Sequence, residues 1–417
     1  MRYKNMPSKN SADQALVREL NLSLTLRLIH NEAPISRAQI AQTTGLNKST
    51  VSSLAESLIE RKLIHENGIT SAVRTGRPAR LLELNPNAGS IIGVEFGVDH
   101  ISVALTDFTG KILWKKNKTT DIREEKEKVF SQTIKLVHEA SAISKKKNLE
   151  TLGIGVATPG TVNIEEGLLI FAPNSQWHNV PLRDFFHKNT GLSVFVENDA
   201  NAATIAENLF GVAKKSDNFI FIFAGVGIGS GLFLNGSLYR GSIGYAGEIG
   251  HSPIMAEPFE APCHCGNRGC WETYANQQAI IRRMQSRLDA RGSSIITKLL
   301  KEGNTSLSIP LIKEAADKGD VEAIEALEET GEAMGLGIAT LASVLNPEKV
   351  IIGGPLSIVG NYLLPSIKSI INKRSLPELS PNVEVLLSNF NKDASLIGSV
   401  SIVVDNIFSN PTSIQRR

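Results

Sequence analysis

Residues 247–251 read GEIGH and residues 263–272 read CHCGNRGCWE, so all three cysteines of the chain fall within eight positions. A disulfide framework would need an even number of cysteines at wider spacing, which leaves metal ligation or a cluster of inert thiols. Three thiolates and one imidazole complete a tetrahedral zinc site without an open position. His264 lies between two of the cysteines and would have to point elsewhere, so we expect it in solvent. The predicted ligands of a structural zinc ion are His251, Cys263, Cys265 and Cys270.

The net charge of the 417-residue chain is +2, and it conceals two unlike parts. Residues 1–90 contain twelve Lys and Arg against seven Asp and Glu, whereas the remainder has a net charge of −3. A basic first fifth on a mildly acidic body suggests a nucleic-acid-binding unit attached to something else. The hydrophobic fraction of 41% and the charged fraction of 21% are ordinary for a folded protein of two or three domains.

The sequence gives no sign of a membrane protein. Its most apolar run, residues 219–234, is interrupted by glycines and is too short for a spanning helix. The first ten residues are polar and basic, unlike a secretory signal. We therefore expect a cytoplasmic protein with no membrane contact.

The basic segment has the pattern of a helix-turn-helix. Leucines at 16, 20, 24 and 28 predict an amphipathic helix over residues 13–31, and Pro34 ends it. Ser36 can cap a second helix over 37–44, Gly45 supplies the turn, and Asn47 can cap a third helix. This third helix, residues 47–62, is the predicted recognition helix, because short polar and basic side chains suit the floor and edges of a major groove. The predicted DNA contacts on it are Asn47, Lys48, Ser49, Ser52 and Ser53.

A wing is expected after the recognition helix. Residues 63–65 look like a strand, Asn67-Gly68 like a hairpin turn, and residues 81–84 like the returning strand. In the Gly-Arg-Pro stretch that follows Arg74, Arg77 lies on an extended backbone that suits a narrow minor groove, so both arginines are predicted DNA contacts. The alternative is a solvated helix in a helical bundle, followed by a charged linker.

The rest of the chain has an α/β pattern that begins after a Pro- and Asn-containing linker near residue 87. Strands are expected at 91–96, 101–105, 111–114, 152–156, 194–196, 219–223 and 349–352. Helices are expected at 123–147, 201–210, 277–290, 309–318, 321–345 and 394–407.

From residue 91 to its end the chain resembles the ROK family of repressors, open reading frames and sugar kinases. Besides the two stretches quoted first, the resemblance rests on ATPG at 157–160, ENDANAA at 197–203 and GVGIGSG at 225–231. It implies an actin-like ATPase fold of two α/β lobes with a sugar in the cleft between them. The implied organisation is a winged helix-turn-helix domain over 1–86, a first lobe over 87–200 plus 394–417, and a second lobe with the zinc site over 201–393.

The resemblance also implies the residues that contact a sugar. The positions that match the family's sugar contacts are Asn198, Asp199, Glu248, His251 and Glu272. Carboxylates accept hydrogen bonds from vicinal hydroxyls, and an amide both donates and accepts. His251 would serve both sites, with one ring nitrogen on zinc and the other toward the sugar. Asp199 is alternatively the N-cap of the helix that follows, and Asn174 is a weaker candidate contact.

Catalysis is not expected. Sugar kinases of the family carry Asp-x-Gly-Gly-Thr at the first strand-turn, where small residues let ATP phosphates approach. Residues 95–99 of this chain read EFGVD, so a branched Val98 replaces the second glycine and the acidic Asp99 replaces the threonine. The acid would repel phosphate, and ATP binding is disfavoured. The glycine loop at 225–231 is retained, but it is equally consistent with close packing between lobes.

The expected function is that of a sugar-responsive repressor, a homodimer or higher homo-oligomer that binds palindromic operator DNA and is released by a monosaccharide. Residues 46–54, 174–177 and 269–275 look most like xylose repressors, so D-xylose is the expected effector. The alternatives are an active sugar kinase with a DNA-binding arm, a repressor that responds to glucose or N-acetylglucosamine, and a repressor whose body docks a transport protein.

Overall fold

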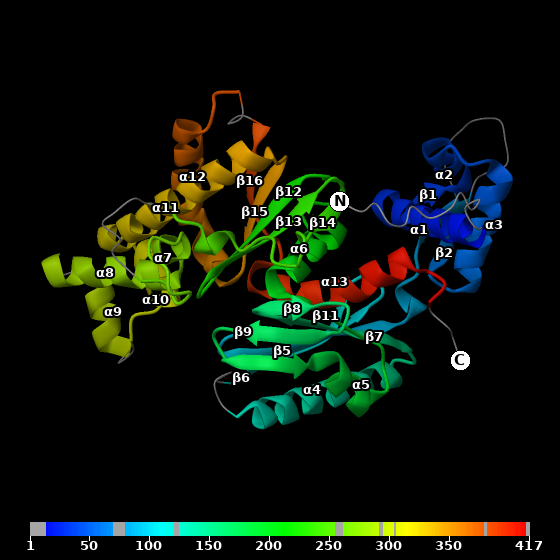
Figure 1. Ribbon diagram of the computed structural model, residues 1–417, viewed down its shortest axis with the longest axis horizontal. Coiled ribbons are helices and arrows are strands. Elements are labelled where there is room, and N and C mark those ends of the chain that lie inside the picture. The colour runs from blue at the N-terminus through cyan, green and yellow to red at the C-terminus, as the bar shows by residue number, and fades with distance from the viewer. Residues whose placement is uncertain are drawn as a thin grey trace, which may run out of the picture.

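The structure is a computed structural model, and it describes residues 14–69, 80–120, 125–254, 262–291, 295–303, 306–378 and 382–413. A small N-terminal domain lies at one end of a two-lobed body (Figure 1). Within the described residues, no helix is long and apolar enough to cross a membrane.

The N-terminal domain is a winged helix-turn-helix. Its elements are α1 (Gln14–Glu32), β1 (Ile35–Ser36), α2 (Arg37–Thr44), α3 (Lys48–Glu60), β2 (Ile64–Ile69) and β3 (Arg80–Leu84), with sheet order β1-β3-β2. Ser36 caps α2 in a reciprocal capping box with Gln39, and Gly45 ends α2 with a φ of 72°. The Asn47 side chain accepts a hydrogen bond from the Thr50 backbone N–H and so caps α3. The predicted helices and their caps are confirmed.

Two details of this domain differ from the expectations. Asn67 and Gly68 do not form the hairpin turn: they lie inside β2, where the register with β3 shifts between Glu66 and Ile69. The φ of Gly68 is 73°, a conformation that serves a bulge as well as a turn. On α1 the leucines at 16, 20 and 24 are exposed, and the neighbouring row formed by Leu22, Leu26 and Ile29 is buried.

The first lobe is built on a five-stranded sheet of order β11-β7-β4-β5-β6. Its strands are β4 (Ser90–Phe96), β5 (His100–Asp107), β6 (Ile112–Thr119), β7 (Thr151–Thr158) and β11 (Val194–Asn198). Helices α4 (Lys126–Lys146) and α5 (Leu182–Thr190) cover one face, and α13 (Ala394–Ser409) returns from the C-terminal end of the chain to cover the other. A side sheet is formed by β8 (Thr161–Asn163), β9 (Leu168–Ala172) and β10 (Trp177–Pro181). Gly93 and Gly155 allow the close approach of α13, since a Cβ at either would meet Ser399.

The second lobe has a five-stranded sheet of order β14-β13-β12-β15-β16. Its strands are β12 (Phe219–Ala224), β13 (Ile228–Leu234), β14 (Ser237–Tyr239), β15 (Lys349–Gly353) and β16 (Glu384–Leu387). Its helices are α7 (Glu272–Ala275), α8 (Gln277–Arg291), α9 (Ile295–Gly303), α10 (Ile309–Asp317), α11 (Val321–Leu345) and α12 (Gly360–Arg374). The glycines of α11 permit close helix packing: Gly331 lies against Leu363 of α12, and Gly337 lies against the Trp271 ring.

Helix α6 (Asp199–Phe210) lies where the two lobes meet. One side packs on α13, where a Cβ at Gly398 would meet the backbone of Ala202. The other side packs on β13, where Gly229 faces Ala200 and Gly231 faces Thr204. Because these contacts are made by small residues, the helix is held close to both lobes.

Candidate functional site

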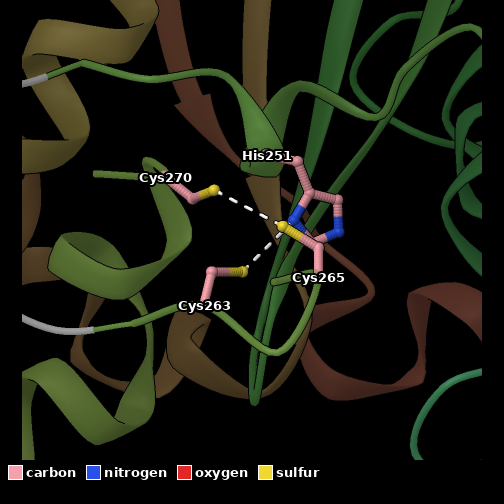
Figure 2. A group of neighbouring side chains, drawn as sticks. All are labelled: His251, Cys263, Cys265 and Cys270. Carbon is pink, nitrogen blue, oxygen red and sulfur yellow. Dashed lines mark hydrogen bonds between the residues drawn. The ribbon is translucent and has the colours of Figure 1, made fainter. Parts of the chain in front are cut away.

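Four side chains converge in the second lobe as the sequence predicts. The ligand atoms of His251, Cys263, Cys265 and Cys270 lie within 4.8 Å of one another (Figure 2). The Cys265 and Cys270 sulfurs are 3.7 Å apart, and the Cys263 sulfur is 3.5 Å from His251 Nδ1. Ligands of a tetrahedral zinc ion lie about 3.8 Å (S–S) and about 3.5 Å (S–N) apart, so this donor set fits zinc. His264 is exposed and is not part of the group.

The ligands come from two segments that the fold brings together. His251 ends a single helical turn, Ile249–His251, and the cysteines lie on the loop that leads into α7. Backbone pairing joins the segments: Pro253 bridges to Cys270, and the Trp271 N–H donates to the Ser252 carbonyl at 2.9 Å. Glu248 and Glu272 flank the ligands, three residues before His251 and two residues after Cys270.

A cavity of about 180 Å³ lies next to this group, at the junction of the lobes. Four of the five predicted sugar contacts line it: Asn198, Asp199, Glu248 and Glu272. Asn174 lines it as well. His251 is not among the lining residues, and its Nδ1 faces the cysteines and Glu272, whose Oε1 is 3.5 Å away. The structure therefore brings His251 to the metal group but does not place it at the cavity wall.

The charges of the cavity wall have one sign. Four of the described lining residues are acidic: Glu197, Asp199, Glu248 and Glu272. No described lining residue is a Lys, Arg or His. The carboxylate of Glu197 is paired with Arg240 at 2.6 Å, which leaves the other three to face the cavity. Such a wall suits a neutral ligand with many hydroxyls and repels a phosphate.

Burial raises the pKa of Asp199 to about 6, and the nearby carboxylates of Glu95 and Glu248 also raise it. The pKa of Glu248 is raised as well, again chiefly by burial. Both side chains line the cavity, Asp199 half-buried and Glu248 exposed, so their carboxylates are placed to accept hydrogen bonds from a bound ligand.

The start of α6 fixes the position of Asp199. Asn198, and not Asp199, is the N-cap: its side-chain oxygen accepts hydrogen bonds from the backbone N–H groups of Ala200 and Asn201. The alternative role of Asp199 as the helix cap is therefore wrong. The amide of Asn198 donates to the Gly160 carbonyl at 3.1 Å, which ties the helix start to the first lobe.

The first strand-turn holds a feature that the sequence analysis missed. The His100 imidazole lies against Gly97, so that a Cβ on Gly97 would clash with the ring. His100 is 2.8 Å from Asp99 and 3.7 Å from the buried Glu95, and the carboxylates, Glu95 first, raise its pKa to about 9. A protonated imidazole that is paired with two carboxylates thus occupies the first strand-turn.

The predicted DNA contacts of α3 lie on its solvent side. Asn47, Lys48, Ser49 and Ser53 are exposed and Ser52 is half-buried, whereas Val51, Leu54 and Leu58 are buried. The side-chain oxygen of Asn47 is engaged by Thr50 and Ser49, which leaves its amide group for other contacts. Arg74 and Arg77 lie outside the described residues.

Two other residues were missed because no motif marks them. Arg240 follows β14 and forms the ion pair with Glu197 described above. His30, near the end of α1, is buried against the body. Both interactions join residues more than 40 positions apart, so no local sequence pattern predicts them.

Known proteins resemble both the whole chain and its body. The chain is 33% identical over 409 residues to the xylose repressor of Caldicellulosiruptor bescii, covering 96% of this chain and 99% of that protein. It is 34% identical over 318 residues to the glucokinase of Thermotoga maritima, covering 76% of this chain and 98% of that protein. A solved ROK family transcriptional regulator, a homolog of the E. coli MLC protein, matches with a TM-score of 0.79 and 30% identity over 94% of this chain and 97% of that one.

Family models agree with these likenesses. Residues 26–68 match the IclR helix-turn-helix domain, and residues 91–406 match the ROK family model. The chain therefore belongs to the ROK family.

Proposed function

We propose that this protein is a transcriptional repressor that binds operator DNA and is released from it by a monosaccharide, D-xylose. The observation that carries the proposal is a cavity with acidic and no basic side chains among its described lining residues, in a chain whose N-terminal domain is a winged helix-turn-helix. The likeness to a xylose repressor over nearly the whole chain supports D-xylose as the effector.

Hydroxyl groups of the sugar donate hydrogen bonds to Asp199, Glu248 and Glu272, and the second amide N–H of Asn198 donates to a sugar oxygen. Free sugars are favoured over sugar phosphates, because the described wall offers no cation for a phosphate. Glucose and N-acetylglucosamine remain the rival effectors, since no described contact excludes a sixth carbon.

We further propose that His251, Cys263, Cys265 and Cys270 hold a structural zinc ion. Zinc supplies no reaction in this role. It ties the segment that carries Glu248 to the segment that carries Glu272, and so fixes the separation of the two carboxylates. The position of His251 outside the cavity wall favours a role in metal binding, with a sugar contact only after closure of the lobes.

The DNA interface is proposed to be the exposed face of α3 together with the wing. Ser49, Ser52 and Ser53 would reach base edges, and Lys48 with Arg74 and Arg77 would contact phosphates or the minor groove. Because helix-turn-helix proteins read two half-sites one helical turn apart, the active form is proposed to be a homodimer. Light scattering at micromolar concentration measures this state directly.

Saturating D-xylose is expected to weaken operator binding at least tenfold. Only a sugar that binds the DNA-free form more tightly can cause this release, and coupling of about 5- to 150-fold is typical. The measurement is fluorescence anisotropy of a labelled operator duplex with and without D-xylose, with xylose 5-phosphate as the matched phosphorylated control. An unchanged operator affinity in D-xylose, glucose and N-acetylglucosamine would refute the proposal.

A second candidate function is phosphorylation of the sugar, which the likeness to a glucokinase favours. We expect no turnover, since His100 fills the first strand-turn and the cavity wall repels phosphate. An ADP-release assay with D-xylose, glucose and N-acetylglucosamine tests this. Turnover that disappears in Asp199→Asn would overturn the expectation, because Asp199 would then act as the general base for the attacking hydroxyl.

A further inference from the structure

The N-terminal domain is not a separate unit on a linker, because its core continues into the body. Leu22, Leu26 and Ile29 of α1 belong to the same buried cluster as Leu209 of α6 and Phe408 of α13. In Figure 1, α13 runs from the junction of the lobes toward the N-terminal domain. The DNA-binding domain therefore rests on two body helices, α6 and α13.

His30 makes the contact with α6. Its Nε2 is 2.7 Å from the Leu209 carbonyl oxygen, one of the acceptors that the last turn of a helix leaves without a partner. The carbonyl can only accept, so the ring donates from Nε2. The His30 ring also packs edge-on against Phe210, with ring centroids 5.6 Å apart, and against Phe408 at 5.2 Å. Burial lowers the pKa of His30 to about 4, which keeps the ring neutral at pH 7.

The chain just after α6 strengthens the same contact. Lys214 Nζ donates to the His30 carbonyl at 2.9 Å, and Lys215 pairs with Glu32 at 2.8 Å. The end of α1 is thus held by side-chain and backbone groups of one short segment, residues 209–215. Helix α1 also contacts α13, through the packing of His30 on Phe408 and through Arg27, which is 2.9 Å from both Asp405 and Ser409.

The opposite end of α6 lies at the cavity. Asp199, its first residue, and Asn198, its cap, both line the cavity wall. A helix of 12 residues is about 18 Å long, and nine residues of this one are buried. Its close packing on α13 and on β13 means that a change in the angle between the lobes must displace it.

We propose that α6 transmits sugar binding to the DNA-binding domain, with His30 as the residue that positions the recognition helix in response. This inference rests on the proposed function and names the physical connection within it. Sugar binding moves the start of α6 through Asp199 and Asn198, and the last turn carries His30 and the end of α1 with it. Helix α6 moves as a rigid unit between two positions, and both the sugar cavity and the DNA-binding domain influence which position it takes.

Two substitutions test the connection. His30→Leu introduces an apolar side chain of similar length and removes the hydrogen-bond donor to the Leu209 carbonyl. His30→Gln restores a donor. The measured quantity is the ratio of operator dissociation constants with and without saturating D-xylose, from anisotropy, and calorimetry gives the affinity for the sugar. We expect a ratio of at least tenfold in the wild type, below about twofold in His30→Leu, and intermediate in His30→Gln. Operator affinity without sugar and sugar affinity without DNA should stay within about threefold of the wild type.

Arg27→Gln is the matched control, because Arg27 lies on the same helix but its described hydrogen bonds go to Asp405 and Ser409 of α13, whereas His30 bonds to Leu209 of α6. It should keep the wild-type ratio. Lys214→Gln, on the segment that follows α6, should lower the ratio and serves as the second variant if His30→Leu does not fold. A wild-type ratio in His30→Leu and Lys214→Gln, or an equal loss in Arg27→Gln, overturns the role of α6. A wild type that does not respond to any sugar refutes the proposed function itself, before any variant is made.

Discussion

Replacing Cys270 with serine is expected to remove the metal and the affinity for the sugar together. The Cys270 sulfur is buried and lies 3.7 Å from the Cys265 sulfur, and the hydroxyl of serine is a poor zinc ligand. Without the ion, the segments that carry Glu248 and Glu272 keep their backbone pairing at Pro253 and Ser252 but lose the ligation that holds His251 to the cysteines. Loss of a structural metal costs at least about 4 kcal/mol, so Tm should fall by roughly 5 °C or more.

The measurement combines metal analysis, thermal unfolding and calorimetry with D-xylose. The wild type should contain one zinc ion per chain and the variant none, with sugar affinity lowered at least tenfold. His264→Ala is the matched control, since His264 is exposed and stands beside two ligands without belonging to the group. It should keep the metal and the affinity. A Cys270→Ser protein that binds D-xylose normally would show that the group is not part of the sugar site.

Local signals account for the parts of the fold that the sequence predicts well. Ser36, Gly45 and Asn47 each satisfy backbone groups within a few residues, so the helices of the N-terminal domain can be located without knowledge of the rest. The metal group is similar, because ligand chemistry and spacing restrict the choices. The ENDANAA motif is different: it indicated Asn198 and Asp199 through the resemblance to the ROK family, and the cap of α6 at Asn198 was not predicted.

The sequence predictions fail for features that depend on contacts with residues far away in the chain. Helix α1 has two adjacent apolar rows, and the row with Leu22 and Leu26 is buried because it packs in one cluster with α3, β3 and the distant α13. An Asn-Gly pair is suited to a backbone with positive φ, which occurs both in hairpin turns and in β-bulges. Whether Asn67-Gly68 forms a turn or a bulge is decided by the pairing of β2 with β3. His30 has no local motif, and its partner Leu209 lies 179 positions away.

Replacing Asp199 with asparagine is expected to weaken D-xylose binding by roughly 30-fold. A hydrogen bond to a charged acceptor contributes about 2 kcal/mol, and asparagine keeps the size of the side chain but not the charge. Asn198 will still cap α6, so the helix should remain in place. Circular dichroism and Tm close to those of the wild type are the control for folding. Calorimetry that gives equal affinities for the two proteins would remove Asp199 from the sugar site.

The affinity for D-xylose should also depend on pH, through the same carboxylate. Its pKa of about 6 without sugar, raised by burial and by Glu95 and Glu248, means that Asp199 is ionised at pH 7 and mostly protonated at pH 5. The ionised form accepts two hydrogen bonds from vicinal hydroxyls, and the protonated form must donate one. Affinity is therefore full above the pKa and is lost as pH falls through about 6, by close to tenfold between pH 7 and pH 5. Asp199→Asn removes this titration, so its affinity should change much less over the same range. An equal pH dependence in both proteins would assign the titration to Glu248 instead, whose pKa is also raised.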